Sequence, residues 1–228
     1  MSLQKLLLTI HEKLTMSLTH AVLLFDFDGV LADTLDDLLS FAAQVSAQLG
    51  HPRQPTKADL EALELMNFDE FARQLQIPEP QVKEFSRRSV QLFLARPQPP
   101  DLFPGLGPVI KRLSASHLAG IVTANTSTVV RGFLDHHGLT SCFKLIVGAD
   151  VPGSKPEKIK TALSKLGVSE ETVYMIGDAV SDVRAARQAG VKSIAVAWGH
   201  QSEAKLSSAL PDYLVRSPGE LEELFFRN

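Results

Sequence analysis

The stretch Ala21-Val-Leu-Leu-Phe-Asp26-Phe-Asp28-Gly29-Val30 decides how this chain folds. Its unbroken apolar run is typical of a strand that is buried on both faces of a parallel sheet. Two carboxylates follow it two positions apart, a spacing that directs side chains to the same face of a strand, and Gly29 allows a sharp turn beyond them. Because burying an unpaired charge is costly, we expect a functional site at this strand end. The alternative is an aspartate that only caps the following helix.

From residue 118 onward, short apolar runs alternate with amphipathic stretches. The expected strands are Leu118–Thr123, Phe143–Val147, Val173–Ile176 and Ser193–Ala197, and the expected helices between them are Ser127–His137, Pro156–Leu166 and Val180–Ala189. Such alternation predicts an α/β fold, in which a Rossmann-like parallel sheet carries helices on both faces.

A helical insertion separates the first strand from the others. Its spacing of apolar residues predicts helices over Leu35–Leu49, Lys57–Met66, Phe68–Leu75 and Glu79–Ala95. Clustered prolines at residues 51–55 and 97–104 mark breaks in the chain. We therefore expect an α/β core formed by residues 20–34 and 100–228, with a small all-α domain of residues 35–99 inserted into it. Residues 1–19 are expected to form an N-terminal extension, with an amphipathic helix.

Composition excludes several classes of protein. A formal net charge of -3 leaves no basic footprint, so nucleic acid is not an expected partner. No apolar run approaches the roughly 20 residues that span a bilayer, so no membrane association is expected. The lone Cys142 excludes an internal disulfide and suits a reducing compartment, which favours a cytoplasmic location. Monomer and homodimer remain equally open.

Two further carboxylates follow another expected strand in Gly177-Asp178-Ala-Val-Ser-Asp182. Their spacing of four places both on one helix face. Asp178 could instead cap the helix, and Asp182 could face solvent. Together with Asp26 and Asp28, however, they would gather oxygen ligands at one edge of the sheet, an arrangement that suits Mg²⁺.

Two segments could hold a phosphate group. Thr123-Ala124-Asn125 follows a strand and offers a hydroxyl and exposed backbone N–H groups, although such residues are ordinary in turns. Lys155 precedes Pro156 at the expected start of a helix. A cation at a helix N-terminus is favourable mainly when an anion binds there.

Taken in order, these segments resemble the motifs of the haloacid dehalogenase superfamily. DFDGVLAD (residues 26–33) resembles its first motif, Thr123 its second, SKPE with Lys155 its third, and GDAVSD (residues 177–182) its fourth. The resemblance covers about residues 20–215, and the helical insertion resembles the cap domain of the superfamily in position and helicity.

The resemblance implies a Mg²⁺-dependent phosphatase that acts on a small phosphate monoester. Asp26 would be the nucleophile and form an aspartyl-phosphate, and Asp28 would serve as general acid and base. Asp26, the backbone carbonyl of Asp28, Asp178 and Asp182 would hold the metal. The residues that would bind the transferring phosphate are Thr123, Ala124, Asn125 and Lys155.

Other activities of the superfamily fit less well. Asp28 argues against a dehalogenase, which lacks this second acid, and Lys57 is a poor candidate for the Schiff-base lysine of a phosphonatase. A sugar phosphomutase similar to β-phosphoglucomutase usually has glycine at the position of Asp182. The run that ends at Trp198-Gly199-His200 resembles phosphoglycolate phosphatases, which makes 2-phosphoglycolate the preferred substrate. A non-catalytic binding or regulatory protein is the remaining alternative.

Residues of the insertion reveal little about specificity. Arg73, Arg87, Arg88 and Arg96 could contact a substrate carboxylate, but solvated helix positions are the commoner outcome. The histidines at positions 136, 137 and 200 have no metal-ligand partner at suitable spacing, so no metal role is assigned to them.

Overall fold

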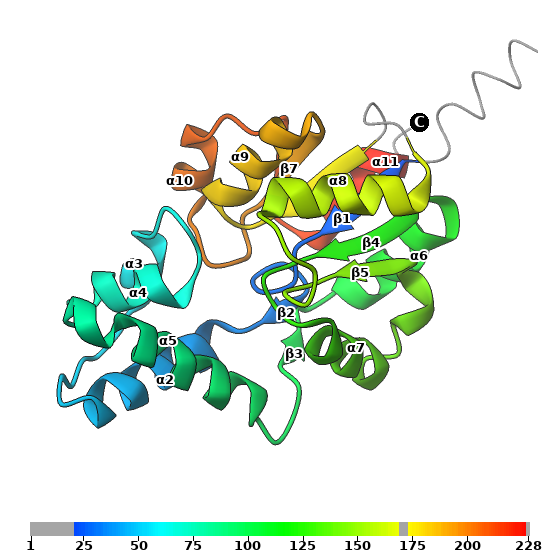
Figure 1. Ribbon diagram of the computed structural model, residues 1–228. Helices are drawn as coiled ribbons and strands as arrows, with labels where there is room; N and C mark the ends of the chain where they lie inside the picture. The colour runs from blue at the N-terminus through cyan, green and yellow to red at the C-terminus, as the bar shows by residue number, and fades with distance from the viewer. Residues whose placement is uncertain (1–20, 169–172, 227–228) are drawn as a thin grey trace, which may run out of the picture.

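The computed structural model describes residues 21–168 and 173–226, so the helix expected within residues 1–19 lies outside it. The main feature is a six-stranded, wholly parallel sheet in the order β5-β4-β1-β6-β7-β8 (Figure 1). Its strands are β1 (Val22–Phe25), β4 (Leu118–Val122), β5 (Leu145–Val147), β6 (Val173–Gly177), β7 (Lys192–Val196) and β8 (Tyr213–Val215). The predicted α/β fold with a parallel sheet is confirmed.

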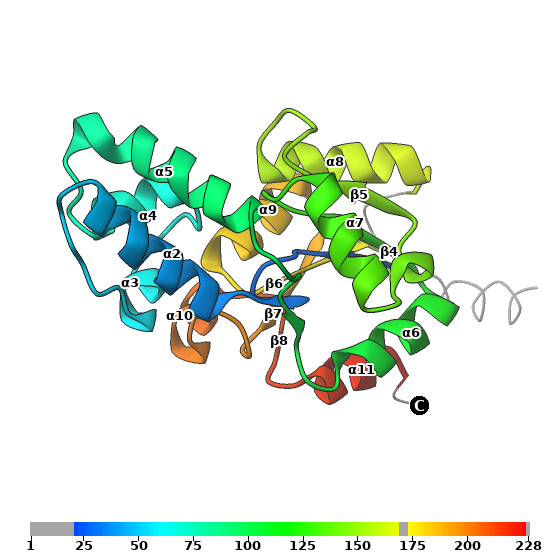
Figure 2. The ribbon, with the colours of Figure 1, turned by 90° about the horizontal axis from the view of Figure 1, so that it is seen from below.

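Helices cover both faces of this sheet, because alternate residues of each buried strand face opposite layers. On β1, Leu23 and Phe25 pack against α6 (Leu106–Ser116), α7 (Ser127–His136) and α11 (Pro218–Phe226). Val22 and Leu24 face the opposite layer, which is formed by α8 (Lys155–Leu166) and α9 (Val180–Ala189). Figure 2 shows the two layers on either side of the strands. Burying each large apolar side chain stabilises this core by about 1.5–3 kcal/mol.

The insertion forms a four-helix unit (residues 35–94) beside the sheet, and this unit has an apolar cluster of its own (Figure 1). Its helices are α2 (Leu35–Gln48), α3 (Lys57–Glu61), α4 (Phe68–Gln74) and α5 (Glu79–Leu94). The expected helix Lys57–Met66 is wrong in its second half, because α3 ends at Glu61 and residues 62–67 form a loop. Asn67 then caps α4 by accepting a hydrogen bond from the Glu70 backbone N–H at 2.9 Å.

A two-stranded antiparallel ribbon joins the four-helix unit to the core. Strand β2 (Ala32–Asp33) carries the chain out, and β3 (Asp101–Leu102) brings it back alongside. Sequence analysis missed this ribbon, because two-residue strands carry no periodic pattern. It also missed α6, the 3₁₀ helix Thr140–Cys142, β8, α10 (Glu203–Ser208) and α11. No helix in the described part of the chain is both long and apolar enough to cross a bilayer.

Candidate functional site

The register of the sheet brings the expected site residues to one edge. Phe25 of β1 pairs with Ile121 of β4 on one side and with Ile176 of β6 on the other. Asp26, Thr123 and Asp178 follow these strands, so they emerge together where open α/β sheets bind ligands. Three of the four sequence segments that were predicted to converge therefore meet at this edge.

Lys155 lies between two of the carboxylates. Its Nζ donates to Asp26 Oδ2 at 2.6 Å and to Asp182 Oδ1 at 2.5 Å. Burial lowers the pKa of this ammonium, but Asp182 and Asp26 outweigh burial and the pKa is raised. Lys155 is the first residue of α8, whose preceding Ser154 forms a capping box with Glu157. The lysine therefore stays charged beside the candidate nucleophile.

Asp28 differs from Asp26 in its surroundings. Its Oδ2 accepts a hydrogen bond from Asn125 Nδ2 at 2.8 Å, whereas its buried Oδ1 has no hydrogen-bond partner among the described residues. Burial, followed by the negative charge of Asp26, raises the pKa of the Asp28 carboxyl to about 6. A carboxyl that retains its proton up to about pH 6 is suited to general acid catalysis.

This raised pKa has a measurable consequence for stability. The Asp28 carboxyl stabilises the fold fully only below its unfolded pKa of 3.8, and that contribution is lost as pH rises through about 6. The free energy of unfolding of the unmodified protein should therefore fall, relative to that of Asp28→Asn, by roughly 1–2 kcal/mol as the pH is raised from 5 to 8. Urea unfolding at a series of pH values, with a chelator present to keep the proteins metal-free, measures this difference. Asp33→Asn removes the same charge from an exposed position and is the control; equal pH dependence in all three proteins would contradict the prediction.

Three carboxylates form a cluster that fits a divalent cation. Asp26, Asp178 and Asp182 each offer an oxygen, and the three oxygens lie within 4.8 Å of one another. Burial raises the pKa of Asp182, because an ionised carboxyl is disfavoured there even with Lys155 as partner. Hard oxygen donors and crowded negative charge are the chemistry that Mg²⁺ or a similar ion satisfies. Asp182 is 2% exposed, so its alternative interpretation as a solvent-facing helix residue is wrong.

His200 is the site residue that sequence analysis missed. Its backbone N–H and its Nδ1 lie 2.7 and 2.8 Å from Asp178 Oδ2, and its Nε2 lies 3.3 Å from Thr34 Oγ1. Burial lowers the pKa of the imidazole, but Asp178 outweighs burial and the pKa is raised. Asp178 is thereby held in place and does not cap α9, whose N-cap is Ala179. The similarity of the run Trp198-Gly199-His200 to phosphatases was the only available signal.

Gly29 lets the loop after β1 approach these residues. Its φ of 75° lies in the left-handed region, and a Cβ there would lie 2.0 Å from Asp178 Oδ2. Any side chain at this position would displace Asp178 or the loop. The sharp turn expected at Gly29 is therefore required by both conformation and space.

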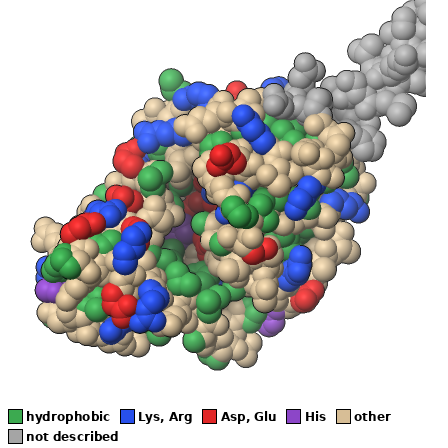
Figure 3. Space-filling model, in the orientation of Figure 1, with side chains coloured by type: hydrophobic (Ala, Val, Ile, Leu, Met, Phe, Trp, Pro, Cys, Tyr) green, Lys and Arg blue, Asp and Glu red, His purple; other side chains and the backbone are tan. Residues whose placement is uncertain are grey.

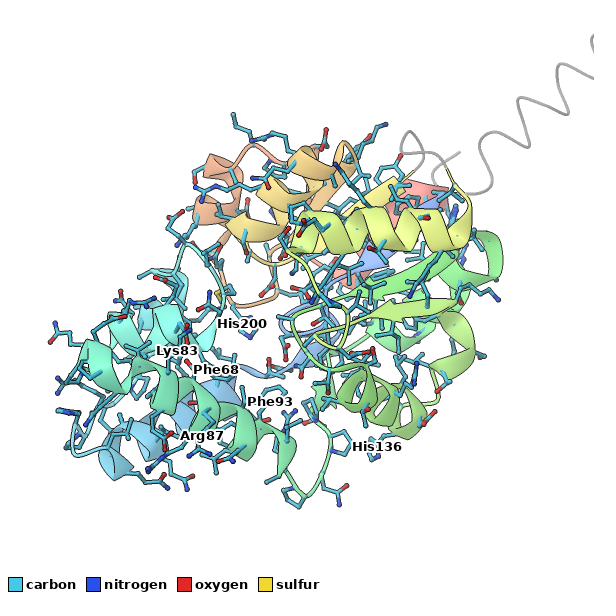
Figure 4. All side chains as sticks on the ribbon, in the orientation of Figure 1. Phe68, Lys83, Arg87, Phe93, His136 and His200 are labelled. Atoms are coloured by element: carbon cyan, nitrogen blue, oxygen red, sulfur yellow. The ribbon has the colours of Figure 1, made fainter. Side chains whose placement is uncertain are left out.

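A cavity of about 840 Å³ lies between the sheet edge and the four-helix unit. Of the eight sequence-predicted site residues all but Asp182 line it, because Asp182 lies behind Lys155. Figure 3 shows a hollow with acidic and histidine side chains recessed within it. In Figure 4, His200 lies on the core side of this space, and Phe68 and Phe93 lie on the side of the four-helix unit.

The arginines of the insertion are engaged elsewhere and do not line the cavity. Arg73 pairs with Glu70 and Glu79, and both Arg87 and Arg88 pair with Glu84. These three follow the expectation for surface helix positions. Arg96 does not, since only 9% of its side chain is exposed: it pairs with Asp37 and stacks on Phe93 with its guanidinium carbon 3.8 Å from the ring centroid. Lys57 Nζ reaches the carbonyl of Gly199 at 3.4 Å.

Backbone carbonyls of the loop after α3 anchor the four-helix unit to the core. Gln201 is fully buried: its Nε2 donates to the Leu63 carbonyl at 2.9 Å, and its Oε1 accepts from the Val180 backbone N–H at 2.7 Å. Lys205 Nζ donates to the same Leu63 carbonyl at 2.8 Å and also to that of Glu61. These bonds use carbonyls that a longer helix α3 would have consumed.

We expect Gln201→Met to destabilise the protein by about 1–3 kcal/mol, because the Val180 N–H loses the Gln201 acceptor and the Leu63 carbonyl keeps only Lys205 as donor. Urea unfolding measures the change, and limited proteolysis should detect faster cleavage in residues 62–67. Gln54→Met, at an exposed position, is the control. Unchanged unfolding and unchanged cleavage would show that this anchor contributes nothing.

Comparisons with family models, related sequences and solved structures all point to one group of hydrolases. The family model described as haloacid dehalogenase-like hydrolase matches residues 23–196. The chain is 29% identical over 201 residues to a phosphoglycolate phosphatase of Synechococcus elongatus, which covers 87% of this chain and 94% of that protein. It is 32% identical over 212 residues to a phosphoglycolate phosphatase of Xylella fastidiosa, covering 86% and 88%. A haloacid dehalogenase-like hydrolase structure from Streptococcus pneumoniae superposes with a TM-score of 0.80 at 24% identity, covering 90% and 98%.

Proposed function

The chain belongs to the haloacid dehalogenase-like hydrolase family, and we propose that it is a Mg²⁺-dependent phosphatase of small phosphate monoesters. The observation that carries this proposal is the grouping of Asp26, Lys155 and the buried carboxyl of Asp28 at one end of the cavity. The names of the similar phosphoglycolate phosphatases support a phosphatase, and 2-phosphoglycolate is the substrate that they suggest. The four-helix unit would act as the cap over this site.

In the proposed reaction, Asp26 attacks the phosphorus atom and an aspartyl-phosphate forms as the bond to the ester oxygen breaks. Asp28 donates its proton to the departing oxygen, which leaves as an alcohol. The ionised Asp28 then takes a proton from water, and this water attacks the phosphorus to release phosphate and restore Asp26. Thr123, Ala124 and Asn125 would hold the equatorial oxygens.

Charge repulsion is the main obstacle to the first step. A carboxylate about 4 Å from one phosphate charge is repelled by ~4 kcal/mol at an effective dielectric near 20, and a dianion roughly doubles this. Lys155 offsets part of that repulsion, because its ammonium already contacts Asp26. Mg²⁺, held by Asp26, Asp178, Asp182 and the carbonyl of Asp28, would supply further positive charge for the phosphate oxygens.

A simple assay tests the proposal. We expect the protein to release phosphate from p-nitrophenyl phosphate with Mg²⁺ and to stop when a chelator is added. A panel of 2-phosphoglycolate, sugar phosphates, nucleotides and pyrophosphate then ranks the substrates. No release from any ester by a folded, metal-loaded protein would contradict the proposal and favour a non-catalytic binding protein, whereas isomerisation of a hexose phosphate without net phosphate release would favour the mutase.

A further inference from the structure

The four-helix unit contributes an apolar wall to the cavity. Its buried part consists of Leu60, Leu63, Phe71 and Phe93, and the partly exposed Phe68 also lines the cavity. Asn67 is the one polar side chain that the described residues of this unit add to the lining. The opposite wall carries the carboxylates, Lys155 and His200. The cavity is therefore divided into a charged end and an apolar end.

The apolar wall continues to the mouth of the cavity. Leu65, Val90 and Leu94 line it and remain 53%, 42% and 51% exposed. Val90 and Leu94 are four residues apart on α5, so they lie on one helix face. Large apolar side chains that gather at the rim of a site typically contact a ligand. These three side chains therefore extend the apolar wall to the exposed rim of the cavity.

A carboxylate substrate finds little to recognise it at this end. Among the described residues, the lining contains two basic side chains, Lys155 and Arg184, and both come from the core. Lys155 forms ion pairs with Asp26 and Asp182 at the sheet edge. Arg184 lies 2.6 Å from Glu64, whose charge it neutralises. A glycolate carboxylate that reaches the apolar wall would exchange its hydration for the Asn67 side chain alone, and burying a charge without an opposite charge is costly.

We propose that the preferred substrate is a phosphate monoester whose organic group is apolar, an alkyl or aryl group, and that the apolar wall selects it. This inference rests on the proposed phosphatase function and narrows its substrate class away from 2-phosphoglycolate. The phosphoryl group occupies the charged end, and the organic group extends along α5 toward Val90 and Leu94. Both fit a cavity that is much larger than glycolate requires.

A series of straight-chain esters tests the proposal without changing the chemistry of the leaving group. Ethyl, butyl and hexyl phosphate release alcohols of nearly equal acidity, so kcat/KM differs mainly through burial of methylenes. We expect kcat/KM to rise by about fourfold for each methylene that becomes buried, and hexyl phosphate to exceed 2-phosphoglycolate. Binding of hexylphosphonate and methylphosphonate by calorimetry gives the same comparison without turnover.

Two variants on one helix locate the effect. Val90→Arg places a cation at the mouth, and we expect it to lower kcat/KM for hexyl phosphate about tenfold while raising that for 2-phosphoglycolate. Gln91→Arg adds the same charge at an exposed position outside the lining, and both values should stay within about twofold.

The possible failures are distinguishable. A flat alkyl series, or 2-phosphoglycolate as the better substrate of the unmodified protein, would overturn the apolar selection while leaving the phosphatase function intact. Equal effects of Val90→Arg and Gln91→Arg would also overturn it. Absence of phosphate release from every ester would refute the proposed function itself; tighter binding of hexylphosphonate than of methylphosphonate would then still support an apolar subsite.

Discussion

Asp26→Asn is expected to reduce phosphate release by several orders of magnitude, on the order of 10⁴-fold or more, as when a covalent nucleophile is removed. Asparagine keeps the shape of the side chain but offers no charged oxygen to attack phosphorus. It also removes one of the three carboxylates of the cluster and the contact with Lys155 Nζ. Activity toward hexyl phosphate and p-nitrophenyl phosphate should fall together, because both reactions need the same nucleophile.

The matched control for this variant is Asp33→Asn, which removes a carboxylate from an exposed position of the nearby strand β2. Phosphate release by Asp33→Asn should remain near that of the unmodified protein. If Asp26→Asn retained a tenth or more of the activity, the aspartyl-phosphate mechanism would be wrong even though the fold is unchanged. Circular dichroism of both variants establishes that they are folded.

Asp28→Asn is expected to produce the second largest effect, and this effect should depend on the substrate. Loss of a general acid costs about 10²–10⁴-fold, and alkyl esters, whose alcohols leave poorly without a proton, should suffer the full loss. p-Nitrophenyl phosphate should suffer less in the first step, since its leaving group needs no proton. A stoichiometric burst of p-nitrophenol should then appear, because the second step still lacks its base.

The pH dependence of the unmodified protein provides an independent check of Asp28. With the pKa of its carboxyl raised to about 6, the acid form is lost as pH rises through that value. For alkyl esters kcat/KM should therefore decline above about pH 6, and for p-nitrophenyl phosphate the decline should be weaker. Identical pH profiles for the two substrates would argue that Asp28 is not the proton donor.

The fold and the convergence of the candidate site residues were predictable because their signals in the sequence are local. β1 is wholly buried, so it reads as an apolar run, and the carboxylates at its end stand out against that run. β4 and β6 are likewise apolar and mostly buried. Because both pair in parallel with β1, their carboxyl ends lie at the same edge of the sheet. The sequence segments therefore converge wherever the sheet order places neighbours.

Features set by distant partners were not predictable. Helix α3 ends at Glu61 although the helical spacing of apolar residues continues. The Leu63 carbonyl beyond it accepts hydrogen bonds from Gln201 and Lys205, which lie more than a hundred residues away in sequence. His200 was given no role, because its partner Asp178 belongs to a different strand end. Arg96 was expected in solvent for the same reason: nothing near it in sequence announces Asp37.

The ribbon of β2 and β3 has a consequence for how this architecture can be modified. The insertion begins and ends at adjacent points, because Asp33 pairs with Asp101. The chain therefore leaves the core and returns to it at one place, without interrupting the sheet. Joining ends that already lie side by side costs little chain entropy, and that cost grows only slowly with length. A different segment could therefore be grafted between these two residues while the sheet edge keeps the candidate catalytic groups Asp26 and Asp28. Under the proposed function, selectivity and reactivity would reside in two separable parts of this chain, linked by four residues of paired backbone.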